Sequence, residues 1–380
     1  MKYRLTCLTP LLVGDGQKLS PIDYMVWREQ VNVLDQRRIF RLLSKGPRLE
    51  GYLAQLRRAE KLDFGAWGGF AQNFADRRIP FEHPSAVAHW ERAKGESLHI
   101  PTFASGPEGP FVPGSAIKGS LRTGMLYAMW RDKLPAGLSG ESERGARRLG
   151  EVAEREALGP SGTNLMRAFR ISDSRPTTGA ATKIYLLRVA TLEPRPGGQF
   201  ALGWKQAPRG SVEAKRVEEA TPLFAEMAVP GTVFEGEWRE NSYLAQEEVW
   251  RALGWDQPVN TAALFAAANA YAARLLEIHR RYAEWAGLRL VVESLDKVAS
   301  HLSTDGRKSC LLAIGWGSGL LAKSGWLDTD AEAYRRVLAQ SALYSKAVRS
   351  GLPFPKTRRV VFLKNQPATL PGWALLEVEP

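Results

Sequence analysis

The chain has 380 residues, 44% of them hydrophobic, which is material for two or three domains or for one domain with large insertions. Lys and Arg number 52 against 40 Asp and Glu, and the net charge of +12 favours a polyanionic partner, nucleic acid before a membrane surface. The two cysteines, Cys7 and Cys310, have no His or Cys neighbours at ligand spacing, which argues against a zinc motif or a disulfide framework. With no signal peptide or membrane span evident, we expect a cytoplasmic protein that uses no cofactor and no metal.

The first third of the chain begins with a predicted strand over residues 2–13. Residues 22–34 predict a hairpin that turns near Glu29-Gln30, and Asp35 is placed to cap a short helix. A basic helix is predicted from about 48 to 61. Residues 62–115 are rich in Gly, Pro and aromatic residues and show no period, which is typical of functional or mobile loops.

A helix is predicted across FVPGSAIKGSLRTGMLYAM, residues 111–129, and the next segment, 132–160, carries dense mixed charge. Further elements are predicted downstream: strands at 166–172 and 183–193, a basic loop at 194–211, a hairpin from TPLFAEMAV and TVFEGEWRE joined at Pro230-Gly231, helices at 258–286 and 328–348, a strand at 310–314, and closing strands in TRRVVFLKN and PGWALLEVE. This order predicts an α+β fold with an antiparallel sheet, for which a ferredoxin-like (RRM-like) βαββαβ core is the natural topology.

The helix at 111–129 departs from local propensity at several positions. Ser115 is a suitable N-cap, but Gly119 and Gly124 each cost ~1 kcal/mol inside a helix. Lys118 lies in the first turn, where the helix dipole favours an anion, and Arg122 lies one turn further on. An anion bound at this helix start accounts for all of these residues. The alternative is a capped core helix with two solvated cations.

The second candidate stretch is Gly315-Trp316-Gly317-Ser318-Gly319, followed by Lys323. Alternate glycines let a backbone approach a ligand closely, although the spacing matches neither a P-loop nor a dinucleotide-binding fingerprint. Trp316 is a candidate for stacking on a base. A structural turn with a core tryptophan accounts for the same residues.

The third candidate stretch is residues 353–359, PFPKTRR, which places three cations beside an aromatic residue in a segment stiffened by proline. Lys356, Arg358 and Arg359 suit a phosphate backbone, with one base stacked on the aromatic ring. A solvated charge run before a strand is the alternative.

Three histidines, His83, His89 and His99, lie in the irregular region 62–115. Each is a candidate general base for RNA cleavage. No partner His or Lys stands at a fixed spacing from any of them, so the sequence favours binding over catalysis.

Three stretches together resemble one family. LTPLLVGDGQKLSPIDYMV, FVPGSAIKGSLRT and GWGSGLLAKSG occur in the order and spacing of the RAMP superfamily of CRISPR proteins. The C-terminal PFPKTRRVVFLKNQPATLPGWALLEV is similar to the terminal backbone subunit of type III-A (Csm) effector complexes. The resemblance covers both ends and the middle of the chain, while residues 132–300 add little to it.

The resemblance implies one RAMP domain over residues 1–380, with an irregular insertion at 48–112, a charged helical insertion at 132–160 and a hairpin and helical region at 194–300. It also implies a non-catalytic ribonucleoprotein subunit that caps the 3′ part of the crRNA, contacts the repeating RAMP backbone subunit and a small helical subunit, and supports crRNA maturation and antiviral RNA targeting. Target RNA is a further potential partner. The residues expected to bind RNA are Gly114, Ser115, Lys118, Arg122, Gly315, Trp316, Gly317, Gly319, Lys323, Lys356, Arg358 and Arg359.

Two other functions stay open within the same superfamily. One is a metal-independent endoribonuclease that processes CRISPR transcripts and would use one of the three histidines as its base. The other is the repeating backbone subunit itself, active with a divalent metal.

Overall fold

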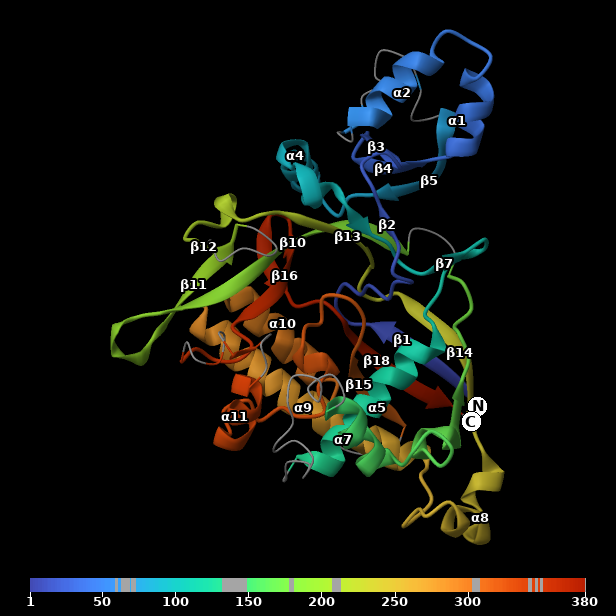
Figure 1. The fold of residues 1–380 in the computed structure, drawn as a ribbon, viewed down its shortest axis with the longest axis vertical. Coiled ribbons are helices and arrows are strands. Elements are labelled where there is room, and N and C mark those ends of the chain that lie inside the picture. Colours follow the sequence, from blue (N-terminus) through green and yellow to red (C-terminus); the bar gives the residue numbers. More distant parts are fainter. Residues whose placement is uncertain are drawn as a thin grey trace.

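The computed structural model describes residues 1–58, 61–62, 69, 73–131, 149–177, 181–206, 213–302, 308–340, 344–345, 348 and 351–379. Within these ranges, helices pack against antiparallel sheets, so the protein has the α+β class predicted from its sequence (Figure 1). None of the helices in these ranges has the length and apolar character needed to cross a membrane.

Most strands belong to three sheets. The described strands are β1 (Lys2–Cys7), β2 (Lys18–Leu19), β3 (Tyr24–Trp27), β4 (Gln30–Leu34), β5 (Ala75–Pro80), β6 (Ile100–Pro101), β7 (Ser105–Gly106), β8 (Gly109–Pro110), β9 (Phe169–Ile171), β10 (Thr182–Pro194), β11 (Phe200–Lys205), β12 (Glu213–Ala214), β13 (Leu223–Ala228), β14 (Val233–Glu240), β15 (Ser309–Ala313), β16 (Thr357–Leu363), β17 (Gln366–Thr369) and β18 (Trp373–Glu379).

The described α-helices are α1 (Gln36–Leu43), α2 (Leu49–Arg58), α4 (Pro84–Arg92), α5 (Gly114–Trp130), α7 (Leu149–Leu158), α8 (Glu247–Ala252), α9 (Thr261–Trp285), α10 (Arg289–Ala299) and α11 (Glu332–Gln340). Short 3₁₀ helices connect several of these elements; they are η2 (Gly95–Leu98), η4 (Leu165–Ala168), η5 (Pro196–Gly198), η6 (Val217–Glu219), η7 (Ser242–Ala245) and η8 (Leu321–Lys323).

The first sheet has the strand order β15-β18-β1-β14-β9, with neighbouring strands antiparallel. Strand β1 alternates strictly: Tyr3, Leu5 and Cys7 are buried, while Lys2 and Arg4 are exposed. Because alternate side chains of a strand lie on the same face, one face of β1 packs toward helices α5 and α9. The buried residues of these helices share a core cluster with β1. The helices approach closely because Gly124 of α5 faces the backbone of α9, where a Cβ atom would lie 2.9 Å from the Ala268 Cα.

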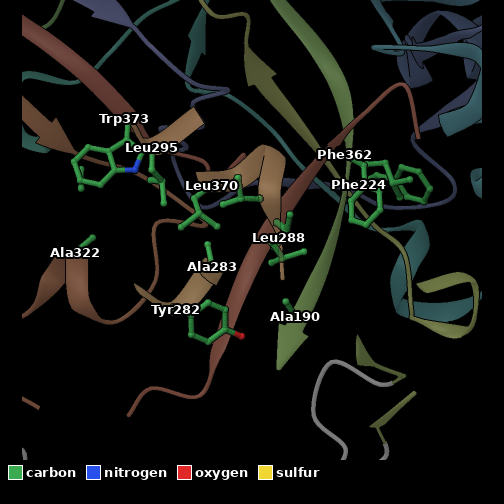
Figure 2. Packing of buried hydrophobic residues seen from close by; sticks show 14 of the residues in the cluster. Ala190, Phe224, Tyr282, Ala283, Leu288, Leu295, Ala322, Phe362, Leu370 and Trp373 are labelled. Carbon is green, nitrogen blue, oxygen red and sulfur yellow. The ribbon is translucent and has the colours of Figure 1, made fainter. Parts of the chain in front are cut away.

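The second sheet is organised by the long strand β10. Its first half pairs with β13, its second half with β11, and β16 pairs along its other edge. Figure 2 shows part of the core of this sheet, in which Tyr282 of α9 and Leu295 of α10 belong to the same buried cluster as Phe224 and Phe362 of the strands. Residues 200–205, predicted as part of a basic loop, instead form β11, because their apolar residues complete this core.

A smaller unit lies at one end of the molecule (Figure 1). It consists of the sheet β3-β4-β5 with helices α1 and α2. The predicted hairpin is correct, although its turn falls at Arg28-Glu29, both at positive φ, one residue earlier than expected. Asp35 caps α1 by accepting the Arg38 N–H, as predicted. The interval 62–115, for which no period was found, contains β5, α4 and η2 among other short elements.

The predicted hairpin at Pro230-Gly231 is wrong. Strands β13 and β14 have the expected bounds, but β13 pairs with β10 in the second sheet and β14 pairs with β1 and β9 in the first. The turn therefore carries the chain from one sheet to the other. The predicted strands near residues 2, 169, 310, 357 and 373 and the long helix at 261–285 are all present.

A buried carboxylate connects the small unit to the rest of the protein. Glu226 of β13 is fully buried and accepts hydrogen bonds from both terminal nitrogens of Arg77, at 2.8 and 3.0 Å. It also accepts from the Thr182 hydroxyl at 2.8 Å and from the Phe103 N–H at 3.2 Å. One side chain thus joins β5, β10, β13 and the segment that leads to α5.

We predict that Glu226→Ala lowers the stability of the folded protein by about 1–3 kcal/mol, because it leaves the buried Phe103 N–H without an acceptor and removes the partner of Arg77 and Thr182. The unfolding midpoint in urea or on heating measures the change. Glu235→Ala, an exposed glutamate of β14, is the matched control and should change stability by less than about 0.5 kcal/mol. Equal effects from the two variants would contradict the role given to Glu226.

Candidate nucleic-acid interface

Helix α5 starts differently from the prediction. Pro113 occupies the N-cap position without a side-chain bond, so Ser115 lies within the first turn and is not the cap. The Gly114 N–H donates to Asp173 Oδ1 at 2.8 Å. A Cβ atom at Gly114 would lie 2.3 Å from the Ile171 carbonyl oxygen, so only glycine fits here. The anion at this helix start is therefore the protein's own carboxylate, which corrects the expectation of a bound ligand at the first N–H group.

Lys118 and Arg122 have different environments. The Lys118 ammonium donates to the Phe169 carbonyl at 2.8 Å, and burial, followed by the nearby Arg170 charge, lowers its pKa. Arg122 forms a half-exposed ion pair with Glu154 of α7 at 3.1 Å. Exposed pairs of this kind contribute only about 0–1 kcal/mol, so Arg122 can exchange Glu154 for another anion at little cost.

The glycine loop 315–319 is held against the N-terminal segment. Gly315, Gly317 and Gly319 all have φ near +90° (87°, 91° and 90°), a backbone conformation that residues other than glycine rarely adopt. The Trp316 N–H donates to the Leu12 carbonyl at 2.7 Å, and a Cβ at Gly315 would lie 2.2 Å from the same oxygen. Around Gly319, by contrast, no atom of the described residues other than its chain neighbours lies within 4 Å of the Cβ position.

The structure brings the start of α5 and the glycine loop together around one cavity of about 520 Å³, which we call the central groove. Its described lining residues are Leu12, Val13, Gly14, Gly16, Gln17, Lys18, Pro101, Thr102, Ala116, Gly119, Ser120, Arg122, Thr123, Ala313, Ile314, Gly315, Trp316, Ser318, Ala322 and Lys323. Lys18, Arg122 and Lys323 are its cations, and none of these lining residues is a carboxylate. Such a lining favours an anionic ligand.

Two further hollows adjoin the central groove. The helix hollow, about 790 Å³, shares Gly119 and Arg122 with it, and its lining comprises Ser115, Lys118, Gly119, Arg122, Glu151, Glu154, Arg155, Gly159, Pro160, Ser161, Asn164, Met166 and Arg167. The loop hollow, about 260 Å³, shares Ser318, and its lining comprises Val189, Lys205, His279, Gly317, Ser318, Gly319, Leu320, Leu321, Pro355, Thr357, Arg358, Arg359 and Leu370. The loop hollow, the central groove and the helix hollow thus adjoin in this order, and each has cations in its lining; we call this series of cavities the run.

Arg358, one of the C-terminal cations, is buried and bonded within the protein. Arg358 is 7% exposed, and its guanidinium donates to His279 Nδ1 at 2.9 Å and to the Pro355 and Thr357 carbonyls at 2.7 and 2.9 Å. Its Nε and Nη1 therefore hold the segment 355–358 in place, and Arg358 also lines the loop hollow. The Lys356 carbonyl accepts from the Leu192 N–H, which fixes the backbone of the same segment.

Arg359 and Trp316 contact each other, with the guanidinium 4.8 Å from the ring centroid. Burial lowers the pKa of Arg359, and its Nε has no hydrogen-bond partner among the described residues. One face of Trp316 is thus covered by a cation, and the ring is packed partly against the core. An Arg359 held over an aromatic ring at a hollow is a suitable donor to a ligand oxygen.

The candidate histidines lie elsewhere. His83 caps α4 through its Nδ1, which accepts the Ser85 N–H. His89 lies between Arg188 and Asn365, at 3.2 and 2.7 Å, and burial lowers its pKa. His99 follows η2. None of these three lines the central groove, the helix hollow or the loop hollow.

Several lining residues were not anticipated from the sequence. Lys18, Arg155, Arg167 and Lys205 contribute cations that were not among the candidate binding residues. The turn at Gly14-Asp15-Gly16 could have indicated a site near Lys18, because glycine lets the chain lie close to Thr102. A Cβ atom at Gly14 would lie 2.8 Å from the Thr102 carbonyl oxygen. In the part of the chain that the structure describes, no cluster of three His, Cys, Asp or Glu residues is arranged to hold a metal ion.

The family model of the RAMP superfamily matches residues 4–255, and the chain therefore belongs to this superfamily. Among curated proteins it is similar to the "CRISPR system Cms protein Csm5" of Mycobacterium tuberculosis strains CDC 1551 / Oshkosh and H37Rv, each 24% identical over 247 residues. The match spans 57% of this chain and 66% of that relative, just under two thirds of its length.

Two solved structures share the fold over nearly the whole chain. A chain from the cryo-EM structure of a Csm-crRNA-target RNA ternary complex of a type III-A CRISPR-Cas system has a TM-score of 0.68 and 20% identity, covering 99% of this chain and 100% of that one. The crystal structure of T. onnurineus Csm5 has a TM-score of 0.62 and 16% identity, with the same coverage.

The two glycines inside α5 give a paired prediction. Among the described residues, and apart from the backbone of its own helix, a Cβ at Gly119 meets nothing within 4 Å, whereas a Cβ at Gly124 meets the α9 backbone at 2.9 Å. Gly119→Ala should therefore stabilise the protein by about 0.5–1 kcal/mol through helix propensity, while Gly124→Ala should destabilise it. Thermal unfolding of the two variants measures both changes; destabilisation by Gly119→Ala would show that this position is not open.

Acid should destabilise the fold through His279. This histidine is neutral because burial, and then the Arg358 charge, lowers its pKa well below the usual value of 6.5. As the pH falls below about 6.5, the unfolded chain gains a proton that the folded chain does not bind, so stability falls by up to about 1.4 kcal/mol per pH unit. The unfolding midpoint measured between pH 7.5 and 5.5 should drop less in His279→Asn, which keeps an acceptor but does not titrate; an unchanged slope would contradict this.

Proposed function

We propose that the protein is a non-catalytic, guide-RNA-binding subunit of a type III-A CRISPR effector complex, and that it caps the 3′ part of the crRNA. The observation that supports this most strongly is the central groove, whose cations come from three distant segments and whose described lining includes no carboxylate. The chain is also similar to Csm5 proteins and to a chain of a Csm-crRNA-target RNA complex.

The groove suits a ribose-phosphate strand better than a compact ligand. Lys18, Arg122 and Lys323 offer charges and donors to phosphates, and Gly119 leaves space in which a strand can approach the backbone. Contacts from these cations to phosphates carry no sequence information, so binding should tolerate many sequences. This property suits a subunit that holds guides of different sequence.

We also propose that β18-β1-β14-β9 with α5 and α9 is a ferredoxin-like core. In chain order these elements read β1-α5-β9-β14-α9-β18, which is βαββαβ. The strand order with antiparallel neighbours agrees with this topology, and β15 extends the sheet beyond β18. Helix α5, which lines the groove, would then belong to this core.

The partners in this proposal are the crRNA, the repeating RAMP backbone subunit and a small helical subunit, with support of crRNA maturation and antiviral RNA targeting as the outcome. The open face of the first sheet carries alternating charges, with Arg4 opposite Glu235 and Glu377. A charged, self-complementary face of this kind suits a neighbouring subunit better than a polyanion.

The endoribonuclease alternative gains no support from the histidine positions described above. Incubation of the purified protein with repeat RNA in the absence of metal tests it directly. We expect no cleavage; cleavage products that disappear in a His99→Ala variant would replace our proposal with the alternative.

Arg122→Gln combined with Lys323→Gln should weaken binding of single-stranded RNA by at least about tenfold, because two charge-assisted phosphate contacts are lost. The slope of log affinity against log salt concentration should become less steep by about one to two. Filter binding or anisotropy over a salt series measures both quantities.

The matched control for this variant is Arg289→Gln combined with Lys297→Gln, which removes two exposed charges from α10, away from the groove. A loss of affinity equal to that of the groove variant would mean that only net charge matters, and the proposed interface would be wrong.

A further inference from the structure

A fourth cavity lies beyond the helix hollow, at the free edge of the first sheet beside β9. We call it the end hollow; its volume is about 360 Å³, and its lining comprises Lys118, Arg167, Phe169, Arg170, Asn241, Tyr243 and Leu244. It shares Lys118 and Arg167 with the helix hollow, so it continues the run that begins at the loop hollow. Three of its seven lining residues are cations and none is a carboxylate.

The cations of the end hollow are crowded. Arg170 lies directly opposite Arg239 across the β9–β14 pair, an arrangement of like charges that destabilises a sheet. Arg239 is paired with Glu237 at 2.6 Å, but in the described part of the chain no carboxylate pairs with Arg170. Lys118 is held by the Phe169 carbonyl and Arg167 by the Gly162 carbonyl. An anion in the hollow would relieve this crowding.

Tyr243 supplies an exposed aromatic ring on a fixed backbone. It is 62% exposed, the most exposed of the large hydrophobic residues described. Its N–H donates to Asn241 Oδ1 at 3.2 Å, and the Asn241 N–H donates to the Ala168 carbonyl at 2.8 Å beside β9. The ring therefore stands at the hollow without being used to build the core.

We propose that the end hollow binds one nucleotide of single-stranded RNA, with its phosphate among Lys118, Arg167 and Arg170 and its base stacked on Tyr243. The inference rests on the proposed function and extends it, because it assigns the direction in which the strand leaves the helix hollow and the residues that hold it there. A concave site with cations and one exposed ring fits a nucleotide, since stacking tolerates any base. A protein partner would require a flatter surface with mixed charge.

The test uses the full-length protein and single-stranded RNA long enough to fill the whole run of hollows. Tyr243→Ala should weaken binding by about 5- to 150-fold, the range that corresponds to the loss of one stacked base. Tyr243→Phe should bind as the unchanged protein does, because the ring is kept. Arg170→Gln should reduce the salt slope by about one.

Leu290→Ala and Arg289→Gln, an exposed apolar residue and an exposed cation of α10, are the matched controls and should leave affinity and slope unchanged. Ultraviolet cross-linking followed by trypsin should place the nucleotide adduct on Tyr243 within the peptide 240–251, which lies between Arg239 and Arg251.

The outcomes separate this inference from the function on which it rests. If Arg122→Gln with Lys323→Gln weakens binding while Tyr243→Ala and Arg170→Gln do not, the end hollow is not a nucleotide site and the proposed function stands. If Tyr243→Ala binds RNA normally but fails to assemble with neighbouring subunits, the hollow is a protein contact and the inference is overturned. If the unchanged protein does not bind RNA, both proposals fail.

Discussion

The buried carboxylate of Glu226 is the constraint on which the arrangement of the molecule depends. A charge with no solvent contact is tolerated only when its lone pairs are satisfied, and here Arg77, Thr182 and the Phe103 N–H satisfy them. These donors come from the small β3-β4-β5 unit, from β10 and from the segment just after Pro101 and Thr102. Because Pro101 and Thr102 line the central groove, the same interaction that docks the small unit also fixes one wall of the groove.

The excess of positive charge divides into two groups with different roles. Arg358 donates to backbone carbonyls and stabilises the framework around the loop hollow. Lys118 donates to the Phe169 carbonyl and also lines the end hollow. Lys18, Arg122 and Lys323 line the central groove. Net charge alone indicates a polyanionic partner but cannot distinguish these groups, because the distinction depends on burial. The cations that bind a ligand should therefore be sought among those that line the central groove and the end hollow.

The sequence predicted most of the elements that depend on local chemistry. The cap at Asp35, the hairpin over β3 and β4 and the apolar stripe of α9 each depend on residues within a few positions of one another. Prediction from the sequence was wrong where the strand that decides the pairing is distant along the chain. Strands β13 and β14 follow a good turn, yet their apolar faces are buried in two different cores, so each pairs elsewhere.

In the candidate site, too, features that depend on nearby residues were predicted, and features that depend on distant residues were not. The glycine loop and the start of α5 were recognisable because each breaks local propensity, which is often a sign of a binding site. The cap of α5 comes from Asp173, 59 positions from Gly114, and no pattern around Ser115 indicates it. Tyr243 and Arg170 become neighbours of Lys118 only through the first sheet and its edge, so the end hollow has no signature in the sequence.

The carboxylates of α7 explain how such a cationic run remains stable without a ligand. Glu151 and Glu154 line the helix hollow between two acid-free hollows, and Glu154 pairs with Arg122. A half-exposed pair contributes little to stability, so its anion can be replaced by a phosphate without a large cost. Glu154 thus keeps Arg122 at the border of the central groove while the groove is empty. Helix α7, the described helix of the charged segment, thus limits repulsion among the cations and leaves them available to a strand.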